Sequence, residues 1–351
     1  MSTIQQNSAM NGDKWQFWID RGGTFTDVVA HAPNGDIRTL KLLSENSRQY
    51  EDAALEAIRR LMGTGDGPID GHKIKSVKMG TTVATNALLE RKGERTLLII
   101  TKGFRDALKI GYQARPRLFD LDVILPEQLY EKVIEVEERI GPNGEIITPL
   151  DISVVREEMS KAYHSGITSV AIVTMHGYKY PDHEEKIAVL GYEIGFDQIS
   201  TSHQTSPLMK LVGRGDTTVV DAYLSPILRR YIDRIEIELG EVPLYFMQSN
   251  GGLASADHFK GKDAILSGPA GGIVGAVKTA ALSGYEKLIG FDMGGTSTDV
   301  AHYAGDYERA FDTEVAGVRI RAPMMRIHTV AAGGGSILKY EDGRFQVGPE
   351  S

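Results

Sequence analysis

The sequence contains no cysteine among its 351 residues. That absence excludes disulfide bonds, cysteine-based zinc sites and cysteine nucleophiles. Long hydrophobic runs are missing too, since no stretch reaches the roughly 18 apolar residues of a membrane-spanning helix. Residues 1–14 are polar and have no apolar core of the kind found in secretory signals. We therefore expect a cytoplasmic protein without membrane contact, with a disordered leader over residues 1–13.

Positive charge is also in short supply. The chain has 39 Lys and Arg against 47 Asp and Glu, which gives a net charge of −8. Because nucleic-acid binders need a basic excess to neutralise phosphates, we expect no nucleic-acid partner. The hydrophobic content of 41% and the charged content of 25% are ordinary for a globular protein of one large domain or two.

The motifs of several common enzymes are absent. Lys262 is followed by Asp263, where a P-loop needs serine or threonine. Ser336 is followed two positions later by Leu338, where the nucleophile elbow of α/β-hydrolases needs glycine. The segment 183–187 lacks the second histidine of a zinc protease helix. Any hydrolytic chemistry must therefore come from a different kind of site.

What the sequence does contain is a nine-residue pattern that occurs twice. Residues 20–28 read Asp-Arg-Gly-Gly-Thr-Phe-Thr-Asp-Val, and seven of the nine positions are identical in residues 292–300. Each copy stands between two short apolar runs, which predicts strand, glycine turn and strand, hence a β-hairpin. A Gly-Gly-Thr turn exposes backbone N–H groups and a hydroxyl in one concavity, an arrangement that suits phosphate oxygens.

The two turns supply the main site candidates. Asp20 and Asp292 are candidate Mg²⁺ ligands, because this ion prefers carboxylate oxygens; with Thr296 they are also the candidate catalytic residues. The candidate phosphate-binding residues of the turns are Gly22, Gly23, Thr24, Gly294, Gly295 and Thr296. The alternative is that each aspartate only caps its own turn, and the duplication favours the functional role. We expect Thr26, Thr298, Asp27 and Asp299 to lock the turns by side-chain hydrogen bonds.

Two further glycine-rich segments are candidate phosphate loops. Residues 267–272 are predicted to follow a short strand at 264–266 and to open a helix, whose first N–H groups can bind anions. The candidates in this segment are Gly268, Gly271 and Gly272, with tight helix packing by small residues as the open alternative. In residues 331–336 the candidates are Gly333, Gly334 and Gly335.

Two other segments carry candidate substrate contacts. Thr81, Thr82 and Asn86 lie where a strand is predicted to give way to a helix, and a plain helix cap is the alternative. Arg115 and Arg117 lie in a polar loop over 104–122 and could hold a substrate carboxylate by paired hydrogen bonds. A solvated loop is the alternative there.

These motifs resemble the hydantoinase A/5-oxoprolinase family, a branch of the actin-like ATPase superfold. The matching segments are residues 20–27, 79–93, 103–106, 267–272, 291–299 and 331–336. Strands and helices alternate, so the class is α/β, and the resemblance implies actin-like, ribonuclease H-like ATPase lobes. Residues 14–205 would form the N-terminal lobe, and 206–351 would be the start of a second, incomplete lobe. Arg21 favours the oxoprolinase branch.

The resemblance implies ATP-dependent hydrolysis of 5-oxo-L-proline to L-glutamate. This part would bind ATP and Mg²⁺, with K⁺ as a further cation, and phosphorylate the lactam oxygen. The partners implied are a small cyclic amide, a B-type hydrolytic region in the same chain or a partner subunit, and further copies of the full-length chain. Without the B-type region we expect no turnover. The alternatives are an N-methylhydantoinase or acetone carboxylase-type ATPase subunit, or a non-catalytic actin-like nucleotide-binding module.

Overall fold

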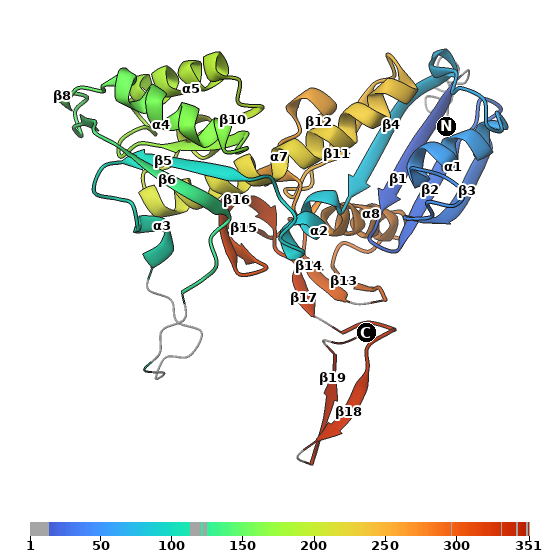
Figure 1. The fold of residues 1–351 in the computed structure, drawn as a ribbon. Helices are drawn as coiled ribbons and strands as arrows, with labels where there is room; N and C mark the ends of the chain where they lie inside the picture. The colour runs from blue at the N-terminus through green and yellow to red at the C-terminus, as the bar shows by residue number, and fades with distance from the viewer. Residues whose placement is uncertain are drawn as a thin grey trace, which may run out of the picture.

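The computed structural model describes residues 14–112, 121, 125–295, 297–330, 332–341, 343–348 and 350. The candidates Arg115, Arg117 and Thr296 lie outside the described residues, as does the predicted leader over 1–13. Figure 1 shows two α/β bodies joined by a long helix, with the strands of the C-terminal part below them. Among the described residues, no helix is both long and apolar enough to cross a membrane.

The first body is built on a six-stranded sheet with the order β12-β11-β4-β1-β2-β3. Its strands are β1 (Trp15–Arg21), β2 (Phe25–His31), β3 (Ile37–Leu43), β4 (Ile74–Thr81), β11 (Leu244–Met247) and β12 (Leu253–Ser255). Strands β1 to β3 form an antiparallel meander, and β4 and β11 run parallel to β1. The parallel strands β1, β4 and β11 therefore end at the same edge of the sheet.

The helices α1 (Ala53–Met62) and α2 (Val83–Leu89) share one hydrophobic core with this sheet. Strand β1 shows why, because Trp15, Phe17 and Ile19 alternate with more exposed residues and point into that core. Helix α1 ends at Gly63, whose left-handed φ of 72° forms its C-cap. Short 3-10 helices lie at Gly71–Lys73, Ala256–His258 and Gly261–Asp263.

The second body holds a four-stranded parallel sheet with the order β10-β9-β5-β6. Its strands are β5 (Thr96–Thr101), β6 (Tyr130–Val136), β9 (Ser169–Val173) and β10 (Gln198–Thr201). Every residue of β5 and β9 is buried, as expected for strands covered on both faces. Helices α4 (Ile152–His164) and α5 (Asp182–Ile194) cover one face, and α3 (Ala107–Ile110) the other. A two-residue strand β7 (Arg139–Ile140) pairs with β8 (Ile146–Thr148).

Helix α7 (Leu211–Leu239) connects the two bodies. The sequence predicts this helix from 217, and the structure begins it earlier, at Leu211. Pro226 lies inside it and has no N–H to bond the carbonyl of Ala222. The Ser169 hydroxyl donates to that carbonyl at 2.6 Å, so the proline leaves no unsatisfied group there.

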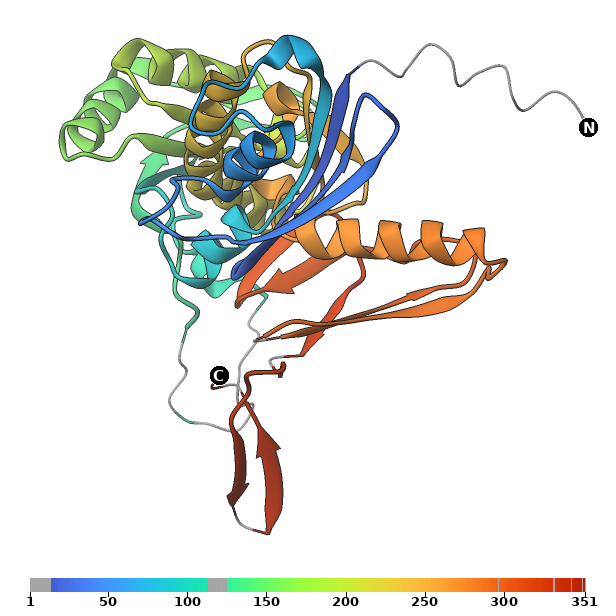
Figure 2. The same ribbon diagram turned by 90° about the vertical axis from the view of Figure 1, so that its right-hand side faces the viewer.

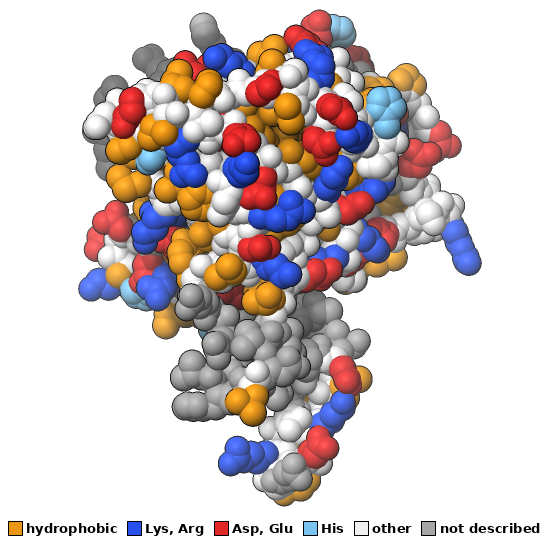
Figure 3. Space-filling view, turned by 60° about the vertical axis from the view of Figure 1, so that its left-hand side comes forward, with side chains coloured by type: hydrophobic (Ala, Val, Ile, Leu, Met, Phe, Trp, Pro, Cys, Tyr) orange, Lys and Arg blue, Asp and Glu red, His pale blue; other side chains and the backbone are white. Residues whose placement is uncertain are grey.

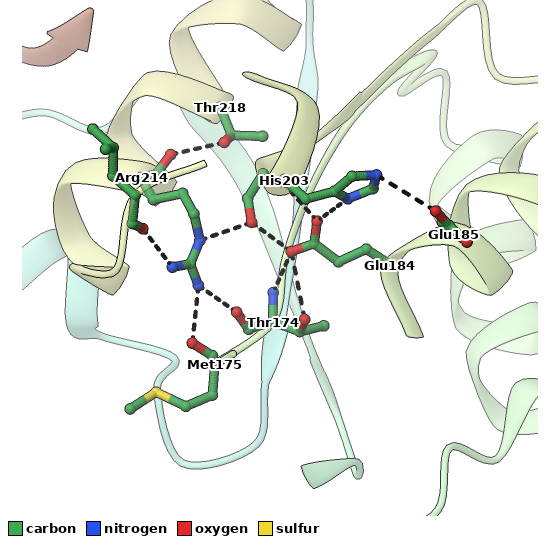
Figure 4. A network of polar contacts seen from close by, with 9 residues as sticks. Thr174, Met175, Glu184, Glu185, His203, Arg214 and Thr218 are labelled. Atoms are coloured by element: carbon green, nitrogen blue, oxygen red, sulfur yellow. Dashed lines mark hydrogen bonds and ion pairs between the residues drawn. The ribbon is translucent and has the colours of Figure 1, made fainter. Parts of the chain in front are cut away.

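A buried polar network holds the start of α7 against the carboxyl ends of β9 and β10, next to the short helix α6 (Ser202–Thr205) (Figure 4). The Arg214 guanidinium donates to Ser202 Oγ at 2.8 Å, to Met175 O at 3.0 Å and to three more backbone carbonyls. The Glu184 carboxylate, fully buried, accepts from His203 Nδ1 at 2.7 Å. All polar side-chain atoms of Arg214 and Glu184 have partners, so the network serves the fold.

The C-terminal part begins with helix α8 (Ser267–Leu282), as predicted. The predicted strand at 264–266 is wrong, because the backbone turns there. Ser267 N–H donates to Ala264 O at 3.3 Å, and Leu266 N–H donates to Ser249 Oγ at 3.1 Å. These apolar residues are buried without a sheet because turn and side-chain partners satisfy their backbone groups.

A second meander follows α8 with the order β13-β14-β17. Its strands are β13 (Leu288–Met293), β14 (Thr298–Tyr303) and β17 (His328–Val330). The hairpins β15 (Arg309–Val315) with β16 (Val318–Met325), and β18 (Leu338–Glu341) with β19 (Arg344–Val347), complete the described chain. Figure 2 shows α8 lying between the first sheet and the β13–β14 hairpin.

The α/β class predicted from the sequence is confirmed. The boundary between 205 and 206 stays a prediction. Strands β11 and β12 lie behind that boundary and nevertheless belong to the first sheet, and the second copy of the repeat opens only with β13. On the face drawn in Figure 3, lysine and arginine side chains are mixed with aspartate and glutamate. That face is not a one-sided basic surface of the kind that binds nucleic acid.

Candidate active site at two matched hairpins

Both copies of the repeat form the predicted hairpin, and their turns close in the same way. Gly22 N–H donates to Phe25 O at 3.0 Å in the first turn, and Gly294 N–H donates to Ser297 O at 2.9 Å in the second. The residues that follow these glycines, Gly23 and Gly295, donate no backbone hydrogen bond within the described chain. Each turn therefore presents an N–H group that a phosphate oxygen can accept from.

The strand register places two aspartates opposite each other in both hairpins. The pairs are Asp20 with Asp27, and Asp292 with Asp299. The second member of each pair is engaged: Lys41 Nζ lies 2.7 Å from the Asp27 carboxylate, and Thr329 Oγ1 donates to Asp299 at 2.6 Å. The first members, Asp20 and Asp292, have no hydrogen bond or ion pair among the described side chains, so their carboxylates are available to a ligand.

The start of α8 brings these two carboxylates together. A Cβ placed on Gly268 would lie 3.5 Å from Asp20 Oδ1, and one placed on Gly272 would lie 3.9 Å from Asp292 Oδ2. Positions four residues apart on a helix are only about 6 Å apart, so both carboxylates lie beside the same turns of α8. Gly80 at the end of β4 is closer still, because its Cβ would lie 3.1 Å from Asp20 Oδ1.

The raised pKa of Asp20 is consistent with a short distance between the two carboxylates. The Asp20 carboxylate keeps solvent access at one side, yet the surrounding protein partly desolvates it and raises its pKa. The negative charges of Asp27 and Asp292 raise that pKa further, while Lys41 lowers it. Desolvation also raises the pKa of Asp299, with Asp292 adding to the effect. A cation placed between Asp20 and Asp292 would relieve this repulsion and favour both ionised forms.

These residues fit the implied Mg²⁺ and nucleotide. No group of three or more His, Asp or Glu side chains able to hold a metal occurs in the described parts of the chain. Mg²⁺ commonly takes one or two carboxylates together with phosphate oxygens and waters, so Asp20 and Asp292 would suffice. Gly23, Thr24 and Gly295 would face the phosphates, because small or exposed residues at these turns leave room for them.

The segment 80–86 supports the first turn from the side. Thr82 N–H and Oγ1 both donate to Arg21 O, at 3.1 and 3.2 Å, and Thr81 N–H donates to Ser267 Oγ at 3.1 Å. Both threonines therefore hold β4, α2 and α8 to the hairpin. Asn86 also lies beside the turn, with Nδ2 3.7 Å from a Cβ placed on Gly23. Its predicted contact with substrate stays a prediction.

The segment 332–336 supports the second turn. Gly334 N–H donates to Gly294 O at 2.9 Å, and Gly335 N–H donates to Gly295 O at 2.8 Å. Gly333 N–H donates to Ser336 Oγ at 2.8 Å. Gly334 and Gly335 therefore brace the second turn, and the predicted phosphate contacts of Gly333, Gly334 and Gly335 stay a prediction. Gly271, the remaining candidate glycine of α8, packs against Met247 of β11.

Replacing Gly333 by alanine is expected to distort the second turn. Its new methyl carbon would lie 2.6 Å from Gly294 O and 2.7 Å from Gly295 O, distances that force the two segments apart. We expect a loss of about 1–3 kcal/mol in the free energy of unfolding and weaker binding of Mg-ATP. Urea denaturation and titration calorimetry would measure the two effects.

Gly334→Ala is the matched control in the same segment. Its methyl carbon would lie 3.8 Å from Gly294 O, an ordinary contact, and neither glycine has a left-handed φ. The control should bind Mg-ATP like the parent chain. Equal effects of the two substitutions would show that the segment does not brace the turn.

Sequence reasoning missed Ser44, which fixes the first turn from the end of β3. Its N–H donates to Thr24 O at 2.8 Å, and its hydroxyl donates to Gly22 O at 2.6 Å. Thr26, fully buried, lies 3.0 Å from the same hydroxyl, which confirms its predicted locking role. A single serine in a polar segment gives no signal of this role in the sequence.

Arg21, the residue that favours the oxoprolinase branch, packs over the Tyr231 ring at 5.3 Å.

Comparisons with known proteins identify the family of the chain. The family model "Hydantoinase/oxoprolinase N-terminal region" matches residues 16–195, and the model "Hydantoinase/oxoprolinase" matches residues 214–351. The 5-oxoprolinase 1 of Arabidopsis thaliana is 47% identical over 370 residues, which cover 96% of this chain and 29% of the plant protein. The chain thus spans under a third of that relative.

Two solved structures share the fold. The crystal structure of the ATP-dependent caprolactamase from Pseudomonas jessenii superposes with a TM-score of 0.80 at 30% identity, over 96% of this chain and 51% of that one. A nucleotide-free acetone carboxylase superposes with a TM-score of 0.77 at 23% identity over the same shares, which shows a similar fold alone. Because the first family model covers more than half of the sequence, the chain belongs to the hydantoinase/oxoprolinase family.

Proposed function

We propose that this chain is the Mg-ATP-binding part of an ATP-dependent cyclic-amide hydrolase whose substrate is 5-oxo-L-proline. The observation that carries the proposal is the pair of matched hairpins, whose unengaged carboxylates Asp20 and Asp292 lie beside the same turns of α8. The similarity to the 5-oxoprolinase of Arabidopsis thaliana supports the substrate. The similarity to the ATP-dependent caprolactamase supports ATP-dependent opening of a cyclic amide.

The chemistry of the substrate explains why ATP is needed. A five-membered lactam is a poor electrophile. The sequence has no nucleophile elbow, and the described residues include no group of three or more metal-ligating side chains. Bound Mg-ATP would transfer its γ-phosphoryl group to the lactam oxygen and leave as ADP, which makes the ring carbon electrophilic. After water adds to that carbon, the C–N bond would break with the nitrogen as the leaving group, and a second water would release the phosphate. In such transfers the protein mainly positions the reactants and stabilises negative charge.

The residues of the two hairpins have separate tasks in this proposal. Asp20 and Asp292 would hold Mg²⁺, and Asp292 would also orient the attacking lactam oxygen. Gly23, Thr24 and Gly295 would donate to the phosphate oxygens. Water attack on the activated carbon would take place in the B-type hydrolytic region, in the same chain or in a partner subunit, since this chain matches only 29% of the Arabidopsis thaliana 5-oxoprolinase.

The test is ADP release by the complete protein that contains this chain. Mg-ATP is supplied with and without K⁺, and 5-oxo-L-proline is compared with caprolactam, hydantoin and acetone. Stimulation by 5-oxo-L-proline above the other three compounds is the expected result. Stimulation by hydantoin or acetone instead would assign the chain to another branch of the family. Nucleotide binding without stimulation by any compound would favour a non-catalytic module.

A further inference from the structure

A cavity of about 370 Å³ lies away from the two hairpins, between the start of α7 and the β15–β16 hairpin. Tyr112, Lys210, Gly213 and Arg321 contribute to its wall. Its volume is at the lower end of the range of small-molecule sites, which begins near about 300 Å³. None of the phosphate-binding candidates among the described residues lines it, so its polar groups need a separate explanation.

The first such group is the guanidinium of Arg321. Its side chain is only 20% exposed, and its Nε and Nη1 atoms are buried without a hydrogen-bond partner in the described chain. Asp312 Oδ1 lies 3.4 Å from Nε, but the Asp312 side chain is 76% exposed and makes no hydrogen bond to it. A buried cation without hydrogen bonds is unfavourable, and a bound anion would supply what is missing.

Arg319, the neighbouring arginine on β16, differs from Arg321 because its guanidinium has hydrogen-bond partners within the protein. Arg319 Nε donates to Asp216 at 2.7 Å, and Arg319 Nη2 donates to Leu108 O at 2.8 Å. Its guanidinium also lies 5.8 Å from the centre of the Tyr112 ring. Arg319 is therefore committed to holding β16 against α3 and α7, whereas Arg321 is left to interact with a ligand.

The position of Arg321 is fixed before any ligand arrives. The backbone N–H of Arg321 donates to Thr217 Oγ1 at 2.8 Å, and the backbone carbonyl of Arg321 accepts from Ser206 Oγ at 3.1 Å. A Cβ placed on Gly213 would lie 3.1 Å from Arg321 Cδ and 3.2 Å from Tyr112 Oη. A glycine at 213 thus allows the arginine side chain to cross α7 closely. A preset side chain loses less entropy on binding.

Other groups of the wall define the chemistry of the ligand. Lys210, exposed at the N-cap of α7, adds a second positive charge. Thr313 adds a buried hydroxyl that has no partner among the described residues. Asp312 and Glu314 also line the cavity, and their negative charges would repel a phosphate dianion more than a monovalent carboxylate.

We propose that this cavity binds a small organic carboxylate through Arg321, with Lys210 adding attraction. The class of ligand follows from the cavity alone. Its identity rests on the proposed function, which offers two such molecules, the substrate 5-oxo-L-proline and the product L-glutamate. The ammonium group of L-glutamate could also approach Asp312 or Glu314, so the two ligands are distinguishable by affinity.

The test is titration calorimetry of this chain with 5-oxo-L-proline, L-glutamate, inorganic phosphate and 2-pyrrolidinone, which is the same lactam without the carboxylate. One or both carboxylates should bind, and 2-pyrrolidinone and phosphate should not. Arg321→Met should weaken carboxylate binding by about tenfold or more, since a hydrogen-bonded charge is lost. Arg344→Met, an exposed arginine on β19, is the control and should leave binding unchanged.

Several results would overturn the proposal. Unchanged carboxylate affinity in Arg321→Met, equal binding of 2-pyrrolidinone, or phosphate binding in preference to the carboxylates would each do so. If Arg321→Met does not fold, Lys210→Met replaces it, and a loss of affinity of roughly threefold is expected for a single exposed charge. Asp292→Asn separates this proposal from the proposed function, because it should weaken Mg-ATP binding and leave carboxylate binding in this cavity intact.

Discussion

Asp292→Asn in the complete protein is expected to reduce 5-oxo-L-proline-stimulated ADP release by about 100-fold or more, the usual cost of removing a charge that acts on a transferring group. The asparagine keeps the size of the side chain and removes the negative charge that faces Asp20 and α8. Coupled ADP-release kinetics with saturating Mg²⁺ would measure the change in kcat.

Asp299→Asn is the matched control on the same hairpin. Asp299 lies directly opposite Asp292 in the β13–β14 register, and its carboxylate accepts from Thr329. An asparagine still accepts that hydrogen bond, so the hairpin should keep its shape and most of its activity. An equal loss in both variants would show that the hairpin needs its overall charge rather than a ligand at Asp292.

Arg214→Met is expected to lower the free energy of unfolding by about 3–5 kcal/mol, because several buried acceptors lose their donor and each unsatisfied one costs about 1–3 kcal/mol. The substitution leaves the buried Glu184 without its neighbouring positive charge and leaves several backbone carbonyls without a donor (Figure 4). Burial lowers the pKa of Arg214, whereas the negative charge of the nearby Glu184 raises it. Urea denaturation of the chain would measure the loss.

Arg156→Met on α4 is the corresponding surface control. Arg156 also pairs with a glutamate, Glu193, but both side chains are 51% exposed. Exposed pairs of this kind contribute roughly 0–1 kcal/mol, so the control should remain close to the parent chain. A similar loss in the two variants would mean that the network around Arg214 is not what stabilises the start of α7.

The sequence predicted the hairpins because their information is local. A duplicated Gly-Gly-Thr turn between short apolar runs specifies strand, turn and strand without help from distant residues. The helix at 267 was predictable for the same reason. The carboxylates Asp20 and Asp292 stood out only because the pattern repeats, since a single aspartate before a turn is ordinarily a cap.

The features that the sequence did not reveal depend on contacts between distant segments. Ala264 to Leu266 looks like a strand, but Ser249 and the Thr85 hydroxyl, which donates to Ile265 O, satisfy its backbone. The Ser202 hydroxyl links Arg214 to Glu184, which lies thirty positions earlier in the chain, and nothing in the sequence spacing predicts that link. The role of Ser44 likewise depends on where β3 ends relative to the turn. Such pairings follow from the tertiary arrangement alone.

Helix α7 has a consequence for protein engineering. Val219 and Ala222 belong to the hydrophobic core of the four-stranded body, whereas Val220 and Tyr223, their immediate neighbours, belong to the core of the six-stranded one. The four-stranded body enters the chain between α2 and α7 and resembles an inserted module. Excising it would nevertheless strip one side of a helix on which the remaining body depends. We therefore expect that the four-stranded body cannot be removed without destabilising the six-stranded body.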